Sequence, residues 1–267
     1  MLNALSQLTG STLTATDGEI GHVKQAYFDD QAWAVRYLVV DTGTWLSGRE
    51  VLISPYAVRQ PVGPGKSIDV SLTRQQVENS PDIDTHKPVS RQHERDYLDY
   101  YAYPQYWAGG ELWSMSALPL LPPNLPPAGG DAEIDAEIAA GIAARTAAHA
   151  AEVPTEDVHL RSSSVVAGYN IQATDHSIGH VKDFIFDDAS WAIRYLVIDT
   201  RNWWPGGKKV LLATHWIDRI DWAEQTVYTQ LTRDQVKASP EYDESASVER
   251  DYEQRLHDAY GREGYWL

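Results

Sequence analysis

Two histidines that each follow a glycine could carry chemistry in this chain. His22 and His180 occur in the segments I-G-H-V-K and I-G-H-V-K, and histidine titrates near neutral pH, so each could relay a proton or bind a metal. Neither has a second ligand at H-x-x-x-H or H-E-x-x-H spacing. We therefore expect half-exposed strand histidines and no metal site.

Adjacent carboxylates form a second candidate site. Asp29-Asp30 and Asp187-Asp188 could hold a cation, but the D-x-[DN]-x-[DN]-G ladder of a calcium loop is absent. Solvated hairpin turns are the expected structure at both places. Asp41 and Asp199 each precede a threonine after an apolar run, which favours an Asx-type turn over an acid–base pair.

Motif and composition searches give no catalytic residue and no cofactor site. G-x-S-x-G, P-loop and dinucleotide fingerprints are absent, and Gly206-Gly207-Lys208-Lys209 is too short to cradle a phosphate. The chain has no cysteine, which excludes disulfides, thiol catalysis and thiolate metal sites. With 22 Lys+Arg against 38 Asp+Glu the net charge is −16, so nucleic acid and anionic lipid are poor partners.

Tryptophans in turns are candidate contacts for a protein partner, because buried tryptophans often dominate the energy of an interface. Trp45, Trp203 and Trp204 lie near glycines in predicted turns, where burial is difficult. Packing against the rest of the chain would explain them equally well. Trp33 and Trp191 begin strands and are expected to fill the interior of a barrel.

Aromatic residues also crowd two segments that follow the predicted strands. Tyrosine and tryptophan bury area while keeping a polar group, which suits an interface; docking onto the chain's own barrels is the alternative. In the second segment Gly261 suits the end of a helix whose apolar face includes Val248 and Leu256. The candidate interaction residues in these segments are Tyr100, Tyr101, Tyr103, Tyr106, Trp107, Tyr252 and Tyr260.

An internal duplication organises these features. The run Trp33–Thr42 returns as Trp191–Thr200, 158 positions later, and Leu72-Thr73-Arg74 returns as Leu231-Thr232-Arg233. A period this long indicates two whole domains rather than a solenoid. We predict a first domain over 1–108, a linker over 109–155 and a second domain over 156–267.

Each repeat reads as several short strands followed by a short helix. Thr73 with Gln76 and Thr232 with Gln235 have the spacing of a capping box, and a Ser-Pro pair stops each helix. Short strands with strong turn signals are best accommodated by a small closed barrel. The linker is Pro-rich over Leu118–Pro127.

The rest of the linker, Asp131–Ala151, is alanine-rich and is predicted to be helical. Ile134, Ile138 and Ile142 form an apolar stripe along it. That stripe is expected to pack on the chain itself; binding of a partner helix is the alternative.

The repeated pattern I-G-x-V, D-D-x-x-W-x-V-R-Y-L-V-V-D-T and L-T-x-x-Q-V-x-x-S-P resembles the PRC-barrel family. It spans Ile20–Pro81 and again Ile178–Pro240. The resemblance implies two tandem small β-barrels, in a mainly β protein with α additions. It also implies a role in organising other proteins, as in the cytoplasmic domain of the photosynthetic reaction-centre H subunit. Stand-alone bacterial members include proteins of stress-related role.

The expected function is therefore a non-catalytic scaffold that assembles with itself or with a protein partner. An accessory role in photosynthetic or quinone-linked electron transfer is one alternative, by analogy alone. A small-molecule or metal-dependent enzyme is the other. No signal peptide or run of 18 apolar residues is found, so we expect a cytoplasmic protein without a membrane span, for which peripheral association with a membrane complex stays open.

Overall fold

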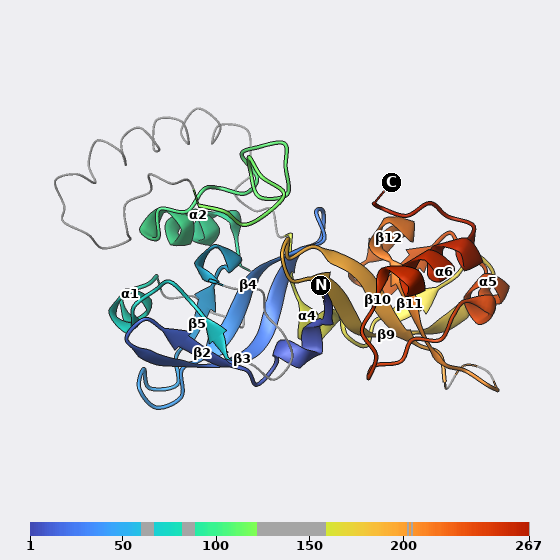
Figure 1. The fold of residues 1–267 in the computed structure, drawn as a ribbon, viewed down its shortest axis with the longest axis horizontal. Coiled ribbons are helices and arrows are strands. Elements are labelled where there is room, and N and C mark those ends of the chain that lie inside the picture. Colours follow the sequence, from blue (N-terminus) through green and yellow to red (C-terminus); the bar gives the residue numbers. More distant parts are fainter. Residues whose placement is uncertain (60–66, 82–88, 122–158, 202, 204, 267) are drawn as a thin grey trace. The chain divides into compact units, whose positions relative to one another are not determined.

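The computed structural model describes residues 1–59, 67–81, 89–121, 159–201, 203 and 205–266 (Figure 1). The chain divides into two units, which we name after the repeat that supplies most of each. The N-repeat unit comprises Thr9–Arg161 and Ala189–Trp191, and the C-repeat unit comprises Met1–Leu8, Ser162–Asp188 and Ala192–Leu267. Both are mainly β with short helices, which confirms the expected fold class. The Ala-rich segment Asp131–Ala151 lies outside the described residues, as do residues 122–127 of the Pro-rich segment.

The N-repeat unit contains a sheet with strand order β5-β4-β3-β2-β6. Its central pair is β3 with β4, joined by a short acidic turn and dense in buried β-branched residues. Strand β7 also pairs with β3, although it comes from the start of the second repeat. The elements are β2 (Thr12–Ala15), β3 (Gly18–Asp29), β4 (Ala34–Asp41), β5 (Glu50–Ile53), η2 (Pro55–Ala57), β6 (Ile68–Asp69), α1 (Arg74–Glu78), α2 (Arg91–Tyr100) and β7 (Leu160–Ser162).

The C-repeat unit repeats this plan with strand order β11-β10-β9-β8-β13-β12. Here too an additional strand, β1, pairs with the long central strand β9, in the register Leu2 to Asp187 and Ala4 to Ile185. The elements are β1 (Leu2–Ala4), η1 (Leu5–Leu8), α4 (Ser163–Val166), β8 (Asn170–Gln172), β9 (Ser177–Asp187), β10 (Ile193–Asp199), β11 (Lys209–Ala213), η3 (Thr214–Trp216), β12 (Ile217–Asp221), β13 (Thr226–Thr229), α5 (Arg233–Ala238) and α6 (Arg250–Tyr260).

Local signals in the sequence produce the predicted helix boundaries. Thr73 and Thr232 each accept a hydrogen bond from the amide three residues on, and the side chains of Gln76 and Gln235 complete both capping boxes. Helix α6 ends at Gly261, which adopts the left-handed conformation with φ 64°. Among the described residues, no helix is long and apolar enough to cross a membrane.

Candidate functional site

Each unit encloses a buried glutamate that binds basic and phenolic side chains. In the N-repeat unit the glutamate is Glu94 of α2, which is 1% exposed. One of its oxygens lies 3.0 Å from His159 Nε2 and 3.2 Å from Arg91 Nη1, and the other accepts a hydrogen bond from the Tyr106 hydroxyl. Burial and the negative charge of Glu94 raise the pKa of Tyr106, so its phenol stays protonated and donates.

Arg36 of β4 lies beside this network and is 2% exposed. Its guanidinium stacks over the Tyr106 ring at 3.8 Å and over the Trp113 ring at 4.7 Å. Its Nη1 donates to the Leu112 carbonyl at 2.7 Å, and its Nη2 lies 3.5 Å from Asp29. The arginine is thus enclosed by charge, carbonyl and aromatic partners of its own unit.

Trp113 completes the enclosure of Arg36. Its ring meets Tyr56 edge-on at 5.0 Å between centroids and Tyr106 at 6.4 Å, and its indole N–H donates to the Ser190 carbonyl at 2.7 Å. The side chain is 2% exposed. Trp113 therefore fills an aromatic slot whose walls are Arg36, Tyr56 and Tyr106.

In the C-repeat unit the buried glutamate is Glu253 of α6. Its carboxylate accepts hydrogen bonds from Tyr195 at 2.8 Å and Tyr265 at 2.9 Å, and pairs with Arg250 at 3.0 Å. His257 is fully buried behind it, with Nε2 3.1 Å from the Tyr195 hydroxyl. Its Nδ1 lies 2.8 Å from the Glu263 carbonyl, which fixes that nitrogen as the donor.

Burial lowers the pKa of His257, so the neutral ring is favoured in the folded unit. A histidine whose pKa is lower folded than unfolded stabilises the fold fully above the unfolded value of ~6.5. That stability is lost as the pH falls through the folded-state pKa, because the unfolded chain then binds more protons.

We therefore expect the C-repeat unit to be less stable at pH 5 than at pH 7.5, measured by urea denaturation with tryptophan fluorescence. His257→Gln cannot titrate and should make the pH dependence shallower. An unchanged slope in that variant would show that His257 does not contribute.

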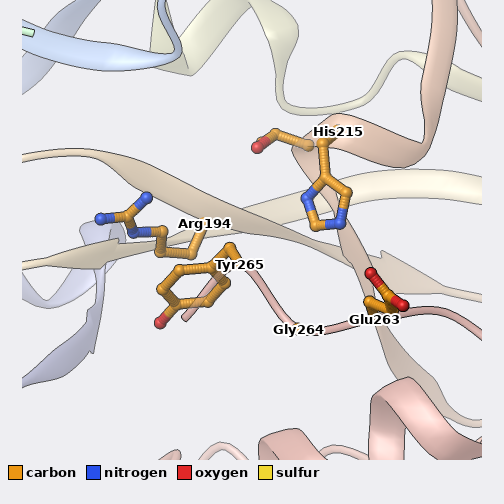
Figure 2. A pocket seen from close by; sticks show the side chains of 6 residues that line it. Arg194, His215, Glu263, Gly264 and Tyr265 are labelled. Atoms are coloured by element: carbon orange, nitrogen blue, oxygen red, sulfur yellow. The ribbon is translucent and has the colours of Figure 1, made fainter. Parts of the chain in front are cut away.

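A pocket of about 360 Å³ opens in the C-repeat unit next to this network (Figure 2). It is lined by Arg194 of β10, by Thr214 and His215 of η3, and by 263–265 after α6. The Arg194 guanidinium lies over the Tyr265 ring at 4.4 Å and only 4.0 Å from Asp187. Its Nε has no hydrogen-bond partner among the described residues. A cation, an imidazole and a phenol ring therefore line this pocket together.

Burial lowers the pKa of His215, followed by electrostatic coupling to the His257 ring and by the positive charges of Arg262 and Arg194. The neutral imidazole can present a ring face to a ligand. Within the described ranges, no group of three His, Asp or Glu side chains is placed to hold a metal ion. The pocket is thus suited to cation–π and ring contacts.

The aromatic residues singled out from the sequence separate into three sets. Tyr101, Tyr103, Tyr106 and Tyr260 are buried in their own units, so they are core residues and a partner cannot reach them there. Trp45, Tyr100, Trp107 and Tyr252 are half-buried. Trp203 is 37% exposed, and Trp204 lies outside the described residues.

Trp45 is tied to its own unit by two contacts. Its indole N–H donates to the Ile20 carbonyl, and the Arg74 guanidinium lies 4.4 Å from its ring. Of the paired strand-start tryptophans, Trp191 is 2% exposed, whereas Trp33 is half-buried against Phe28.

Both acidic pairs lie at turns as predicted, but the expectation that they are solvated is wrong for one residue of each pair. Asp29 and Asp188 are 5% and 7% exposed. Asp29 accepts the amides of its turn, and Asp30 pairs with Arg161 at 2.7 Å, a residue distant in sequence that covers the turn. Since a buried carboxylate needs partners, these pairs hold the hairpins to neighbouring segments.

The expected Asx turns are confirmed. Asp41 accepts the Gly43 amide at 2.8 Å, and Asp199 accepts the Arg201 amide at 3.0 Å. The Arg201 guanidinium also holds the pKa of Asp199 at about 2. His22 is exposed on β3, and His180 is half-exposed on β9.

Sequence reasoning missed the glutamate network of each unit, the roles of the equivalent arginines Arg36 and Arg194, and Trp113. A signal was present: the repeat continues past the barrels with R-x-x-E and Y-W, 159 positions apart. The matched residues are Arg91 and Arg250, Glu94 and Glu253, Tyr106 and Tyr265, and Trp107 and Trp266.

Comparison with known families identifies a domain near the start of the chain. The model of the PRC-barrel domain matches residues 2–68, which confirms the resemblance for the first repeat. This domain is not a catalytic family, and its presence is compatible with a non-catalytic module. None of the curated proteins matches the chain.

Proposed function

We propose that this chain is a non-catalytic protein-interaction module that contacts a protein partner through Trp203. The observation that supports this is the exposure of Trp203 in the turn between β10 and β11. The residue at the same place in the first repeat is Trp45, which packs on Ile20 and Arg74 of its own unit. A tryptophan that keeps an accessible ring is a natural anchor for an interface.

The partner is a polypeptide rather than a nucleic acid or an anionic lipid surface, because a net charge of −16 repels phosphates. The PRC-barrel match supports an interaction role of this kind, since such domains often mediate contacts between proteins. Self-assembly through the same tryptophan is the second outcome that the experiment below separates.

We expect Trp203→Ala to lower the capture of the partner by about tenfold or more, corresponding to at least ~1.4 kcal/mol at an interface anchor. The measurement is a pull-down with the tagged full chain from native extract, quantified by mass spectrometry. Light scattering of the purified chain reports self-assembly.

The control variant is Val165→Ala, which removes another exposed apolar side chain of the C-repeat unit. Trp45→Ala should instead destabilise the N-repeat unit, because it loses a hydrogen bond and a cation–π contact. If Trp203→Ala captured the same proteins in the same amounts and kept the same mass, the proposal would be wrong.

A further inference from the structure

The pocket of the C-repeat unit and the Trp113 slot of the N-repeat unit are built from corresponding residues. Arg36 and Arg194 occupy the same position in β4 and β10, 158 residues apart. Tyr56 of η2 corresponds to His215 of η3, and Tyr106 corresponds to Tyr265, each pair 159 residues apart. The matched residues lie in a strand, in a 3-10 helix and in the segment after the last helix. All three walls of the Trp113 slot therefore have a counterpart in the C-repeat unit.

In the N-repeat unit these walls enclose a tryptophan and the peptide bond before it. Trp113 contacts the three side chains at 4.7, 5.0 and 6.4 Å, and the Arg36 guanidinium binds the Leu112 carbonyl at 2.7 Å. The Tyr56 hydroxyl lies 3.4 Å from the Trp113 carbonyl. The slot therefore recognises both an indole ring and the backbone that carries it.

In the C-repeat unit the corresponding side chains line the pocket shown in Figure 2. Arg194 is 30% exposed, against 2% for Arg36, so its guanidinium is open to solvent where that of Arg36 is enclosed. The pocket volume of about 360 Å³ lies within the ~300–1,000 Å³ range of ligand sites. The Arg194 guanidinium already lies on the Tyr265 ring, as Arg36 lies on Tyr106.

We propose that this pocket binds a tryptophan-bearing segment of a partner protein, in the way that the N-repeat unit binds its own Leu112-Trp113. The indole would contact Arg194, His215 and Tyr265, and the preceding carbonyl would accept a hydrogen bond from Arg194. Cation–π contact with a partly desolvated arginine favours an aromatic ligand. The neutral state of His215 suits contact with a second ring.

The proposal for this pocket rests on the proposed function in one respect only, namely that the ligand is a polypeptide. It uses a different surface from Trp203, which does not line the pocket. The chain would then have two contacts for a partner: a tryptophan that it offers and a pocket that receives one.

The test uses a fluorescently labelled peptide with the sequence of residues 109–117, GGELWSMSA, titrated with the full chain and followed by anisotropy. We expect saturable binding that Arg194→Gln weakens at least tenfold. The same peptide with alanine for tryptophan should not bind. Arg255→Gln, which removes an equal charge from the exposed face of α6, is the matched control and should bind as the unaltered chain does.

Two further variants keep the result interpretable. His215→Ala alters an exposed side chain, so it tests the pocket if Arg194→Gln misfolds by circular dichroism. Trp203→Ala should bind the peptide normally. Partner capture therefore tests the proposed function, and peptide binding tests the pocket, so each proposal can fail without the other. Absence of binding at millimolar peptide, or binding that Arg194→Gln and His215→Ala leave unchanged, would overturn the proposal.

Discussion

Replacing Glu94 with alanine should lower the free energy of unfolding of the N-repeat unit by about 3–5 kcal/mol. Glu94 is 1% exposed and is the shared partner of Arg91, His159 and Tyr106. Its removal leaves the buried Arg91 cation without its carboxylate and opens a cavity among groups that water cannot reach. Both effects act in the same direction.

Glu94→Gln separates charge from volume. The amide oxygen can still accept from Tyr106, so this variant should cost less than alanine. Glu78→Ala removes an exposed glutamate from α1 of the same unit and should change stability by less than ~0.5 kcal/mol. Urea denaturation followed by circular dichroism gives the free energies, and hydrogen exchange over residues 91–100 locates the loss. A Glu94→Ala cost below ~1 kcal/mol would show that the network contributes little net stability.

The strands and the helix starts could be predicted from the sequence because local chemistry determines them. Nearly continuous runs of β-branched, leucine and aromatic residues form β4 and β10, and the Thr-x-x-Gln spacing begins α1 and α5. Pairing partners could not be predicted in the same way. Leu2–Ala4 pairs with β9 and Leu160–Ser162 with β3, so the first strand of each repeat joins the sheet of the other. No local pattern in a three-residue strand specifies which sheet receives it.

The aromatic residues show why a functional site is harder to predict than a fold. Residue type correctly indicates large buried area, but burial is decided by tertiary neighbours. Tyr101 and Tyr106 are enclosed, whereas Trp203 keeps an accessible ring. Trp113 lies in a segment that composition assigns to the linker, and yet it packs in the N-repeat unit against Tyr56.

Because the chain is duplicated, each position of one repeat can be compared with the equivalent position of the other. The same arginine position is closed by the chain's own tryptophan in one unit and lines a pocket in the other. Because both units keep the arginine and the strand that carries it, the difference lies in what the arginine contacts and not in the fold. This difference between the two units supports the proposed interaction with a protein partner.

Replacing Gly21 with alanine should destabilise the N-repeat unit by about 2–6 kcal/mol, since backbone strain and steric overlap each cost ~1–3 kcal/mol. Gly21 has φ 154°, and a Cβ there would lie 2.0 Å from the Asp41 carbonyl oxygen of the paired strand. Backbone atoms on both sides would have to move. Gly179→Ala should act similarly in the C-repeat unit, because its Cβ would lie 2.4 Å from the Asp199 carbonyl oxygen.

Gly43→Ala is the matched control for this prediction. Gly43 also has a positive φ, 59°, but a Cβ there meets nothing within 4 Å. That variant should therefore show only the ~1–2 kcal/mol cost of a left-handed alanine. Thermal and urea denaturation of the three variants distinguish strain from overlap. Equal costs for Gly21→Ala and Gly43→Ala would mean that β3 and β4 separate easily at Asp41, and that the close strand approach at this glycine is not required for the sheet.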